Sequence, residues 1–309
     1  MKFHSNGKLL ITGEYAVLDG ALALAVPAKF GQSLEVDPRE DDRIVWKSLD
    51  MKNQVWFETE FQIKDIKNAH NLNQEKSENE QNNISERLKH ILRQAQLLNP
   101  EILSDNRGFT MTSRLEFPRE WGLGSSSTLI NNIAQFFQID AYTLLKNTFG
   151  GSGYDIAAAQ HDHPITYQLT KTNRSVLTAA FHPDFTDDLF FVHLNRKQNS
   201  RDSIEHYKQQ PREFLEETIT KIAGLTQSFI YCETLEEFKL LMTIHETLIS
   251  KLINTPKIKS ELFPDFPGGI KSLGGWGGDF ILATGGAAEK AYFKEKGYHT
   301  LVPYAHMVK

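Results

Sequence analysis

The sequence contains only one cysteine, Cys232, in 309 residues. A single cysteine excludes a disulfide within the chain and a metal site built from several cysteines, and it is typical of proteins from a reducing cytoplasm. We therefore expect a cytoplasmic protein in which Cys232 serves as a small buried apolar residue.

Long apolar runs and basic clusters are lacking as well. The apolar run near the N-terminus is interrupted by Gly13 and Glu14, so we expect neither a signal peptide nor a membrane span. The formal net charge is -5 and no arm of Lys and Arg stands out, which argues against a nucleic-acid-binding surface. We expect no membrane and no nucleic acid among the partners, and any bound anion must be met by local groups.

What the chain does have is enough apolar material for a full core, since 40% of its residues are hydrophobic. At this length a single core stops growing, so we expect two lobes. Extended patterns dominate the opening third and predict an antiparallel meander, with strands at 8–18, 22–36, 43–49 and 55–63.

The rest of the chain alternates helical and extended patterns. Residues 64–83 are almost wholly polar, which indicates an insertion outside the packed structure. A polar loop at 195–203 precedes two long amphipathic helices at 212–231 and 234–253, the second opened by a capping box of Thr234 and Glu237. We place the boundary between the lobes at that loop.

Three glycine-rich turns each stand beside a distinct polar residue: Gly122 to Thr128, Gly150 to Asp155, and Gly274 to Asp279. The first turn follows an alternating pattern at 109–117 and precedes apolar residues at helical spacing, which predicts a strand, a turn and a helix. The start of a helix leaves backbone N–H groups unpaired and carries partial positive charge, so this turn favours an anion such as phosphate. Taken alone, an ordinary helix cap after a glycine turn explains it equally well.

None of these turns has the spacing of a P-loop or of the Rossmann dinucleotide motif. The composition of the turns instead suggests a site where backbone amides hold phosphates, while a carboxylate and a lysine from elsewhere handle a hydroxyl group.

The motifs together resemble those of the GHMP kinase superfamily, named for galactokinase, homoserine kinase, mevalonate kinase and phosphomevalonate kinase. The matching segments stand in the family's order: Gly7 to Leu18, Pro118 to Ser127, Gly151 to Asp155, and Lys271 to Asp279. The resemblance implies an α+β fold of two lobes. Residues 1–195 would form an ATP-binding lobe like domain 2 of ribosomal protein S5, and residues 196–309 a ferredoxin-like lobe.

The resemblance also implies ATP as the phosphoryl donor, Mg2+ as its counter-ion, and roles for individual residues. Asp155 would be the catalytic carboxylate at the acceptor, and Lys8 the cation that pairs with it and favours the alkoxide. The phosphates would be held by Gly122, Leu123, Gly124, Ser125, Ser126 and Ser127, with the hydroxyl of Ser126 reaching Mg2+. A third loop would close over the transferring group with Gly274, Gly275, Gly277 and Gly278. The simpler alternatives are a helix N-terminal acid for Asp155 and a surface lysine at a strand edge for Lys8.

Two departures from the family pattern stand out. Mevalonate kinases have a metal-binding glutamate roughly a helix length before the catalytic aspartate, and 140–149 contains none. Magnesium would then rest on serine and ATP oxygens. Trp276 stands in the last motif, Lys271 to Asp279, where glycine is usual. Its ring either narrows the pocket or points into the core between the lobes, and we favour the second.

The resemblance points to an ATP-dependent kinase of the mevalonate pathway of isoprenoid biosynthesis, acting on a small hydroxy acid or its phosphate. Glu14 to Leu18 and the run after Gly153 are more similar to phosphomevalonate kinase than to mevalonate kinase. A diphosphomevalonate decarboxylase and a non-catalytic sensor on the same scaffold are the alternatives, and a homodimer stays open.

Overall fold

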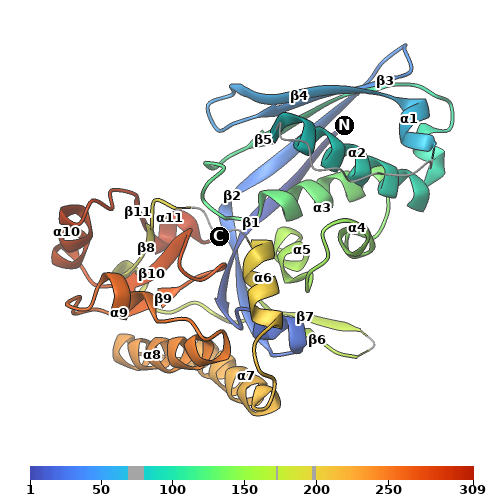
Figure 1. The fold of residues 1–309 in the computed structure, drawn as a ribbon. Helices are drawn as coiled ribbons and strands as arrows, with labels where there is room; N and C mark the ends of the chain where they lie inside the picture. Colours follow the sequence, from blue (N-terminus) through green and yellow to red (C-terminus); the bar gives the residue numbers. More distant parts are fainter. Residues whose placement is uncertain (69–79, 172, 197–199) are drawn as a thin grey trace. The chain divides into compact units, whose positions relative to one another are not determined.

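The computed structural model describes residues 1–68, 80–171, 173–196 and 200–309 (Figure 1). Most of the predicted polar insertion, 69–79, and residues 197–199 of the predicted polar loop lie outside the described residues. The chain forms two compact units, the first comprising Met1–Gly7, Phe30–Arg119 and Gly124–Gln160, and the second Lys8–Lys29, Glu120–Leu123 and His161–Lys309. The predicted lobes, 1–195 and 196–309, divide the chain differently, and that division stays a prediction.

Two long strands contribute residues to both units, β1 (Lys2–Thr12) and β2 (Ala23–Pro38). The 3-10 helix η1 (Ala16–Asp19) connects them, where the sequence predicted that the first strand would continue to residue 18. The other elements of the first unit are β3 (Arg43–Leu49), β4 (Val55–Gln62), α1 (Ile63–Lys67), α2 (Glu80–Leu98), η2 (Pro100–Leu103), β5 (Phe109–Leu115), α3 (Ser125–Phe137), α4 (Ala141–Thr148) and α5 (Tyr154–Ala159).

Strand β5 lies between β2 and β3, so the predicted antiparallel meander is wrong in its strand order. It pairs antiparallel with β2 and parallel with β3, while β3 and β4 form the predicted antiparallel pair. Parallel strands require a long crossover connection. Between β3 and β5 this connection is the part of the chain that contains β4 and α2. Local patterns specify strands but not the order in which they pair.

Helices α2 and α3 lie against the strands of the first unit (Figure 1). Buried apolar side chains from both partners form its core, among them Trp46 of β3, Met111 of β5, Leu92 of α2 and Ile133 of α3. Helices α4 and α5 pack against α3, which fixes where α5 begins.

The second unit contains a four-stranded antiparallel sheet in the order β11-β8-β10-β9. Strands β6 and β7 instead extend the large sheet from β2, since β6 pairs with Ala23 to Ala25. The elements of this unit are β6 (Ile165–Leu169), β7 (Arg174–Thr178), η3 (Thr186–Asp188), β8 (Leu189–His193), α6 (Ser200–Lys208), α7 (Leu215–Tyr231), α8 (Leu235–Leu252), α9 (Ile258–Leu262), β9 (Ile270–Ser272), β10 (Phe280–Thr284), α10 (Ala287–Glu295), β11 (Leu301–Pro303) and α11 (Tyr304–Met307).

Several local predictions are confirmed in this unit. Thr234 caps α8 by accepting a hydrogen bond from the backbone N–H of Glu237 at 3.2 Å, and Cys232 is buried. The predicted loop 195–203 is wrong at its end, because α6 begins at Ser200. Its helix places Tyr207 in an apolar cluster, which the polar composition of its start did not indicate.

Candidate functional site

The first glycine turn ends where α3 begins. Gly124 has a φ of 89°, a left-handed conformation that favours glycine, and α3 starts at the next residue. The hydroxyl of Ser127 donates to the carbonyl of Gly124 at 2.9 Å, so this side chain is buried and turned toward its own helix. Ser126 is exposed and Ser125 is half-buried, so these two of the three predicted serines are accessible.

The second glycine turn positions Asp155. Gly150, Gly151 and Gly153 all have positive φ, and α5 begins directly after Gly153. Asp155 is half-buried in the first turn of α5, and its Oδ1 accepts a hydrogen bond from the N–H of Ile156 at 3.1 Å. Because α5 packs against α3, the first unit brings the helix that carries Asp155 onto the helix that follows Gly124.

Lys8 and Gly122 meet in the second unit. The backbone N–H of Lys8 donates to the carbonyl of Leu123 at 2.9 Å, and its ammonium donates to the carbonyl of Gly122 at 3.2 Å. The structure thus brings the predicted cation to the predicted phosphate turn. The expected pairing of Lys8 with Asp155 joins residues of different units and stays a prediction.

Gly122 is also packed against Asp279, a contact that sequence reasoning missed. A Cβ atom at Gly122 would lie 2.3 Å from Oδ2 of Asp279, and Gly122 has a φ of 63°, so both space and backbone conformation require glycine. Asp279 itself is buried, with its N–H donating to the carbonyl of Arg196 and its carbonyl accepting from Leu194. The position of an aspartate directly after the third glycine-rich loop was the available signal.

The third loop is anchored by Trp276. Gly274 and Gly277 adopt positive φ, and so does Trp276 at 31°, which is unfavourable for a bulky side chain. The Trp276 ring is 4% exposed in an apolar cluster of the second unit, and its Nε1 donates to the carbonyl of Pro256 at 3.0 Å. Its ring therefore packs into the protein, as the sequence interpretation favoured, and burial offsets the backbone strain.

Sequence reasoning missed a buried cluster of ionisable residues next to the first and last motifs. Glu14 forms an ion pair with Lys271, and neither side chain has exposed surface. His245 Nε2 accepts a hydrogen bond from the N–H of Gly13 at 3.1 Å, while Glu246 accepts from the N–H and the hydroxyl of Ser272 at 3.0 and 3.1 Å. The cluster thereby contacts the backbone of both motifs.

Burial dominates the protonation of this cluster. It raises the pKa of Glu246 to about 8, with only partial compensation from Lys271, and it also raises the pKa of Glu14. Burial, followed by the charge of Lys271, holds the pKa of His245 well below its usual range. The neutral imidazole is consistent with Nε2 acting as an acceptor. Near neutral pH Glu246 and His245 are therefore neutral.

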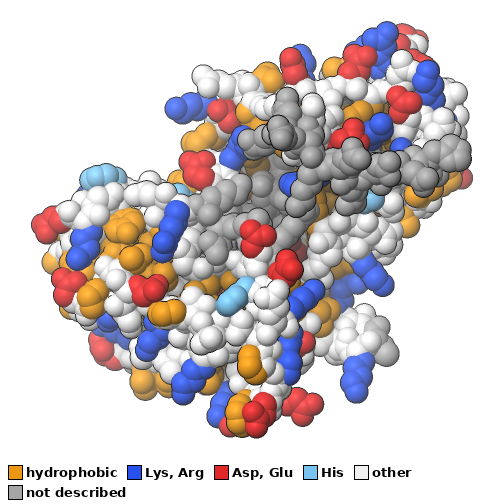
Figure 2. Space-filling view, viewed as in Figure 1, with side chains coloured by type: hydrophobic (Ala, Val, Ile, Leu, Met, Phe, Trp, Pro, Cys, Tyr) orange, Lys and Arg blue, Asp and Glu red, His pale blue; other side chains and the backbone are white. Residues whose placement is uncertain are grey.

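Lys and Arg side chains are interspersed with Asp and Glu over the face drawn in Figure 2. In the part of the chain that the structure describes, no helix has the length and apolarity needed to cross a membrane. The same residues contain no group of three or more His, Cys, Asp and Glu side chains arranged to hold a metal ion.

Comparison with solved structures reveals the fold. The chain is similar to mevalonate kinase from Methanococcus jannaschii, with a TM-score of 0.68 and 20% identity over 97% of this chain and 96% of that one. It is similar to Streptococcus pneumoniae phosphomevalonate kinase in complex with phosphomevalonate and AMPPNP, with a TM-score of 0.67 and 17% identity over 97% and 99%. Lactococcus lactis galactokinase complexed with galactose matches with a TM-score of 0.64 and 14% identity over 100% and 92%.

The chain has the GHMP kinase fold. No protein-family model and no curated protein sequence matches the chain, so its similarity to known proteins is found by comparing structures. The α+β fold class predicted from the motifs is confirmed. The structures that share this fold include complexes with mevalonate, phosphomevalonate and galactose, so the same fold accommodates several small molecules.

Proposed function

We propose that this protein is an ATP-dependent kinase that transfers the γ-phosphoryl group to a hydroxyl of a small acceptor. The observation that carries the proposal is the match over nearly the whole chain to kinase structures, one of them a complex with phosphomevalonate and AMPPNP. The four ordered sequence motifs that resemble those of GHMP kinases support it independently.

Phosphoryl transfer passes through a loose transition state that needs little covalent assistance. Asp155 is proposed to take the proton of the acceptor hydroxyl, and Lys8 to stabilise the resulting alkoxide. The amides at the start of α3 and the loop of Gly274, Gly275, Gly277 and Gly278 are proposed to hold the phosphates, with Gly122 to Ser127 as the main cradle.

Magnesium would neutralise phosphate charge during transfer. Mg2+ prefers oxygen ligands, keeps several waters and relies on substrate phosphates, so it needs few protein groups. The exposed hydroxyl of Ser126 fits this requirement, whereas the hydroxyl of Ser127 is directed to Gly124. We propose Ser126 as the protein ligand.

The proposed acceptor is phosphomevalonate or mevalonate. Glu14 to Leu18 of the first motif and the run after Gly153 favour phosphomevalonate. The single buried cysteine supports a cytoplasmic enzyme.

The decisive experiment incubates the purified protein with Mg-ATP and a panel of mevalonate, phosphomevalonate, homoserine, galactose and a heptose phosphate, and measures ADP formation. We expect phosphomevalonate or mevalonate to stimulate turnover and to acquire phosphate. If only a sugar stimulated turnover, the protein would still be a kinase, but the proposed acceptor would be wrong. In a separate incubation with Mg-ATP and diphosphomevalonate, carbon dioxide released in proportion to ADP would indicate a decarboxylase in place of the kinase. ATP binding without turnover on any acceptor would indicate a sensor.

A further inference from the structure

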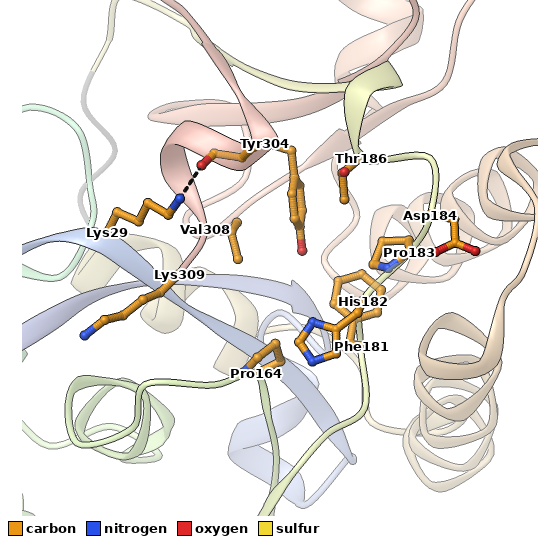
Figure 3. Close-up of a pocket in the computed structure, with 11 residues that line it drawn as sticks. Lys29, Pro164, Phe181, His182, Pro183, Asp184, Thr186, Tyr304, Val308 and Lys309 are labelled. Atoms are coloured by element: carbon orange, nitrogen blue, oxygen red, sulfur yellow. Dashed lines mark hydrogen bonds between the residues drawn. The ribbon is translucent and has the colours of Figure 1, made fainter.

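A cavity of about 460 Å³ lies within the second unit, apart from every residue assigned above to catalysis, phosphate or metal (Figure 3). This volume is within the range of sites that bind small organic molecules. Its lining comes from four separate stretches of the chain, namely Lys29 of β2, Pro164, residues between Phe181 and Thr186, and residues between Tyr304 and Lys309.

The inner wall of the cavity is apolar and its rim is polar. Pro164, Phe181 and Val308 are buried lining residues, whereas Lys29, His182 and Asp184 are exposed. Such a division suits a ligand with a short apolar body and a charged group.

Lys29 supplies a positioned positive charge. Its ammonium donates to the carbonyl of Ala305, which also lines the cavity, at 2.6 Å (Figure 3). An ammonium has three donors, so this bond fixes the position of the charge without exhausting its donors. The ammonium of Lys309 forms an ion pair with Asp162, which leaves Lys29 as the more effective cation for a ligand.

Tyr304 supplies a donor that the ligand-free structure leaves unused. The side chain is 6% exposed, and among the described residues its hydroxyl has no hydrogen-bond partner. In Figure 3 that hydroxyl points toward the part of the cavity where Phe181 and His182 lie. The ring is held by stacking on Phe191, with centroids 5.9 Å apart and planes 20° apart. A buried hydroxyl without a partner is costly, so a bound group that accepts from this donor would stabilise the protein.

We propose that this cavity binds a small organic anion, a carboxylate or a phosphate monoester with a short apolar body. The hydroxyl of Tyr304 and the ammonium of Lys29 bind the anionic oxygens, and Phe181 and Val308 contact the apolar body. The site is separate from the proposed acceptor and ATP sites, and it does not depend on the kinase proposal.

Isothermal titration calorimetry on the full chain tests the proposal with three probes of similar size: butyrate, n-butyl phosphate and the uncharged butanol. We expect one of the two anions to bind and butanol to bind at least about tenfold more weakly, because the charge-assisted hydrogen bonds are lost. Butyrate and butyl phosphate distinguish a carboxylate site from a phosphate site.

Two variants locate the binding. Lys29→Met removes the charge and is expected to weaken anion binding at least about tenfold, while Lys171→Met removes an exposed lysine elsewhere and changes nothing. Tyr304→Phe keeps the ring on Phe191 and removes only the hydroxyl, so it is expected to fold, to melt no lower than the wild type without ligand, and to bind several-fold more weakly. Tyr292→Phe is its matched control, because the hydroxyl of Tyr292 donates to Asp265 outside the cavity.

Anion binding that is unchanged in both Lys29→Met and Tyr304→Phe would place the anion elsewhere and overturn the proposal. So would the absence of binding by either anion, or equal binding of butanol and the anions.

Discussion

Glu14 and Lys271 lie 257 positions apart in the chain, and their side chains form an ion pair with no exposed surface. Glu14 belongs to the first motif of the GHMP kinase resemblance and Lys271 begins the last. The pair therefore fixes two motifs of the second unit against each other, and Glu246 reinforces it by binding the backbone of Ser272. The cluster thereby holds the backbone at Gly13 and at Ser272.

Removing one partner of the buried pair should be strongly destabilising. Glu14→Gln leaves the charge of Lys271 without its counter-ion, and we expect a loss of about 3–5 kcal/mol in the free energy of unfolding, measured with urea. In Glu14→Gln with Lys271→Met the loss should be smaller than the sum of the single losses. Glu35→Gln breaks the exposed ion pair with Lys2, and its free energy of unfolding should stay within about 1 kcal/mol of the wild-type value. An equally mild effect of Glu14→Gln would show that the pair contributes little.

Stability should fall as pH rises from about 6.5 to about 8. The pKa of Glu246 is about 8 in the folded protein, against about 4.3 in an unfolded chain, so the native state holds the proton that the unfolded state has lost. The stability from this proton is fully present below the unfolded pKa and is lost as pH rises through the folded one, with a slope of at most about 1.4 kcal/mol per pH unit.

The other two titratable groups of the cluster, Glu14 and His245, determine the pH range in which the effect of Glu246 can be measured. The raised pKa of Glu14 acts in the same direction, whereas the lowered pKa of His245 reduces stability only below its usual value of about 6.5. In Glu246→Gln the decline between about pH 6.5 and 8 should become shallower, while Glu213→Gln, at an exposed position, should retain it. Parallel profiles for Glu246→Gln and the wild type would contradict the assignment.

Asp155→Asn should lower turnover by at least about a hundredfold, the usual scale for a general base, and leave ATP binding nearly unchanged. Steady-state ADP formation and nucleotide titration measure the two effects separately. Asp140→Asn is the matched control, since Asp140 caps α4 by accepting from the N–H of Thr143 and asparagine caps equally well. Near-normal turnover in Asp155→Asn would remove Asp155 from the mechanism.

Ser126→Ala and Ser127→Ala should behave differently despite being neighbours. Ser126 is exposed and is the proposed Mg2+ ligand, so its loss should raise the Mg2+ concentration needed for half-maximal turnover roughly tenfold, the lower range for a lost ligand-shell interaction. The hydroxyl of Ser127 is bound to Gly124, so Ser127→Ala should alter stability and leave the Mg2+ requirement as it is. The reverse pattern would assign the metal to Ser127.

Trp276→Ala should destabilise the protein by about 3–5 kcal/mol, the usual cost of deleting a large buried aromatic ring. Trp276→Phe keeps most of the packing and loses the hydrogen bond to Pro256, so its cost should be near 1 kcal/mol. Thermal and urea unfolding measure both. If Trp276→Phe instead changed the KM for ATP with stability preserved, the indole would have a role at the nucleotide.

The sequence by itself determined the local elements and the family of motifs. Alternation predicted β3 and β4, the cap of Thr234 predicted the start of α8, and the glycine turns before α3 and α5 followed from residues that tolerate positive φ. These features depend on neighbours within a few positions, which is the range that periodicity and turn chemistry report.

Only the tertiary structure decided which distant residues meet. In the fold, β5 lies between β2 and β3, and Asp279 packs against Gly122. Trp276 is buried in an apolar cluster. A buried polar cluster is formed by Glu14, His245, Glu246 and Lys271. The local sequence singled out Gly122, Trp276 and Asp279 but did not show what each would contact. Their chemistry arises from burial and from partners far along the chain, since desolvation and pairing are properties of the folded environment.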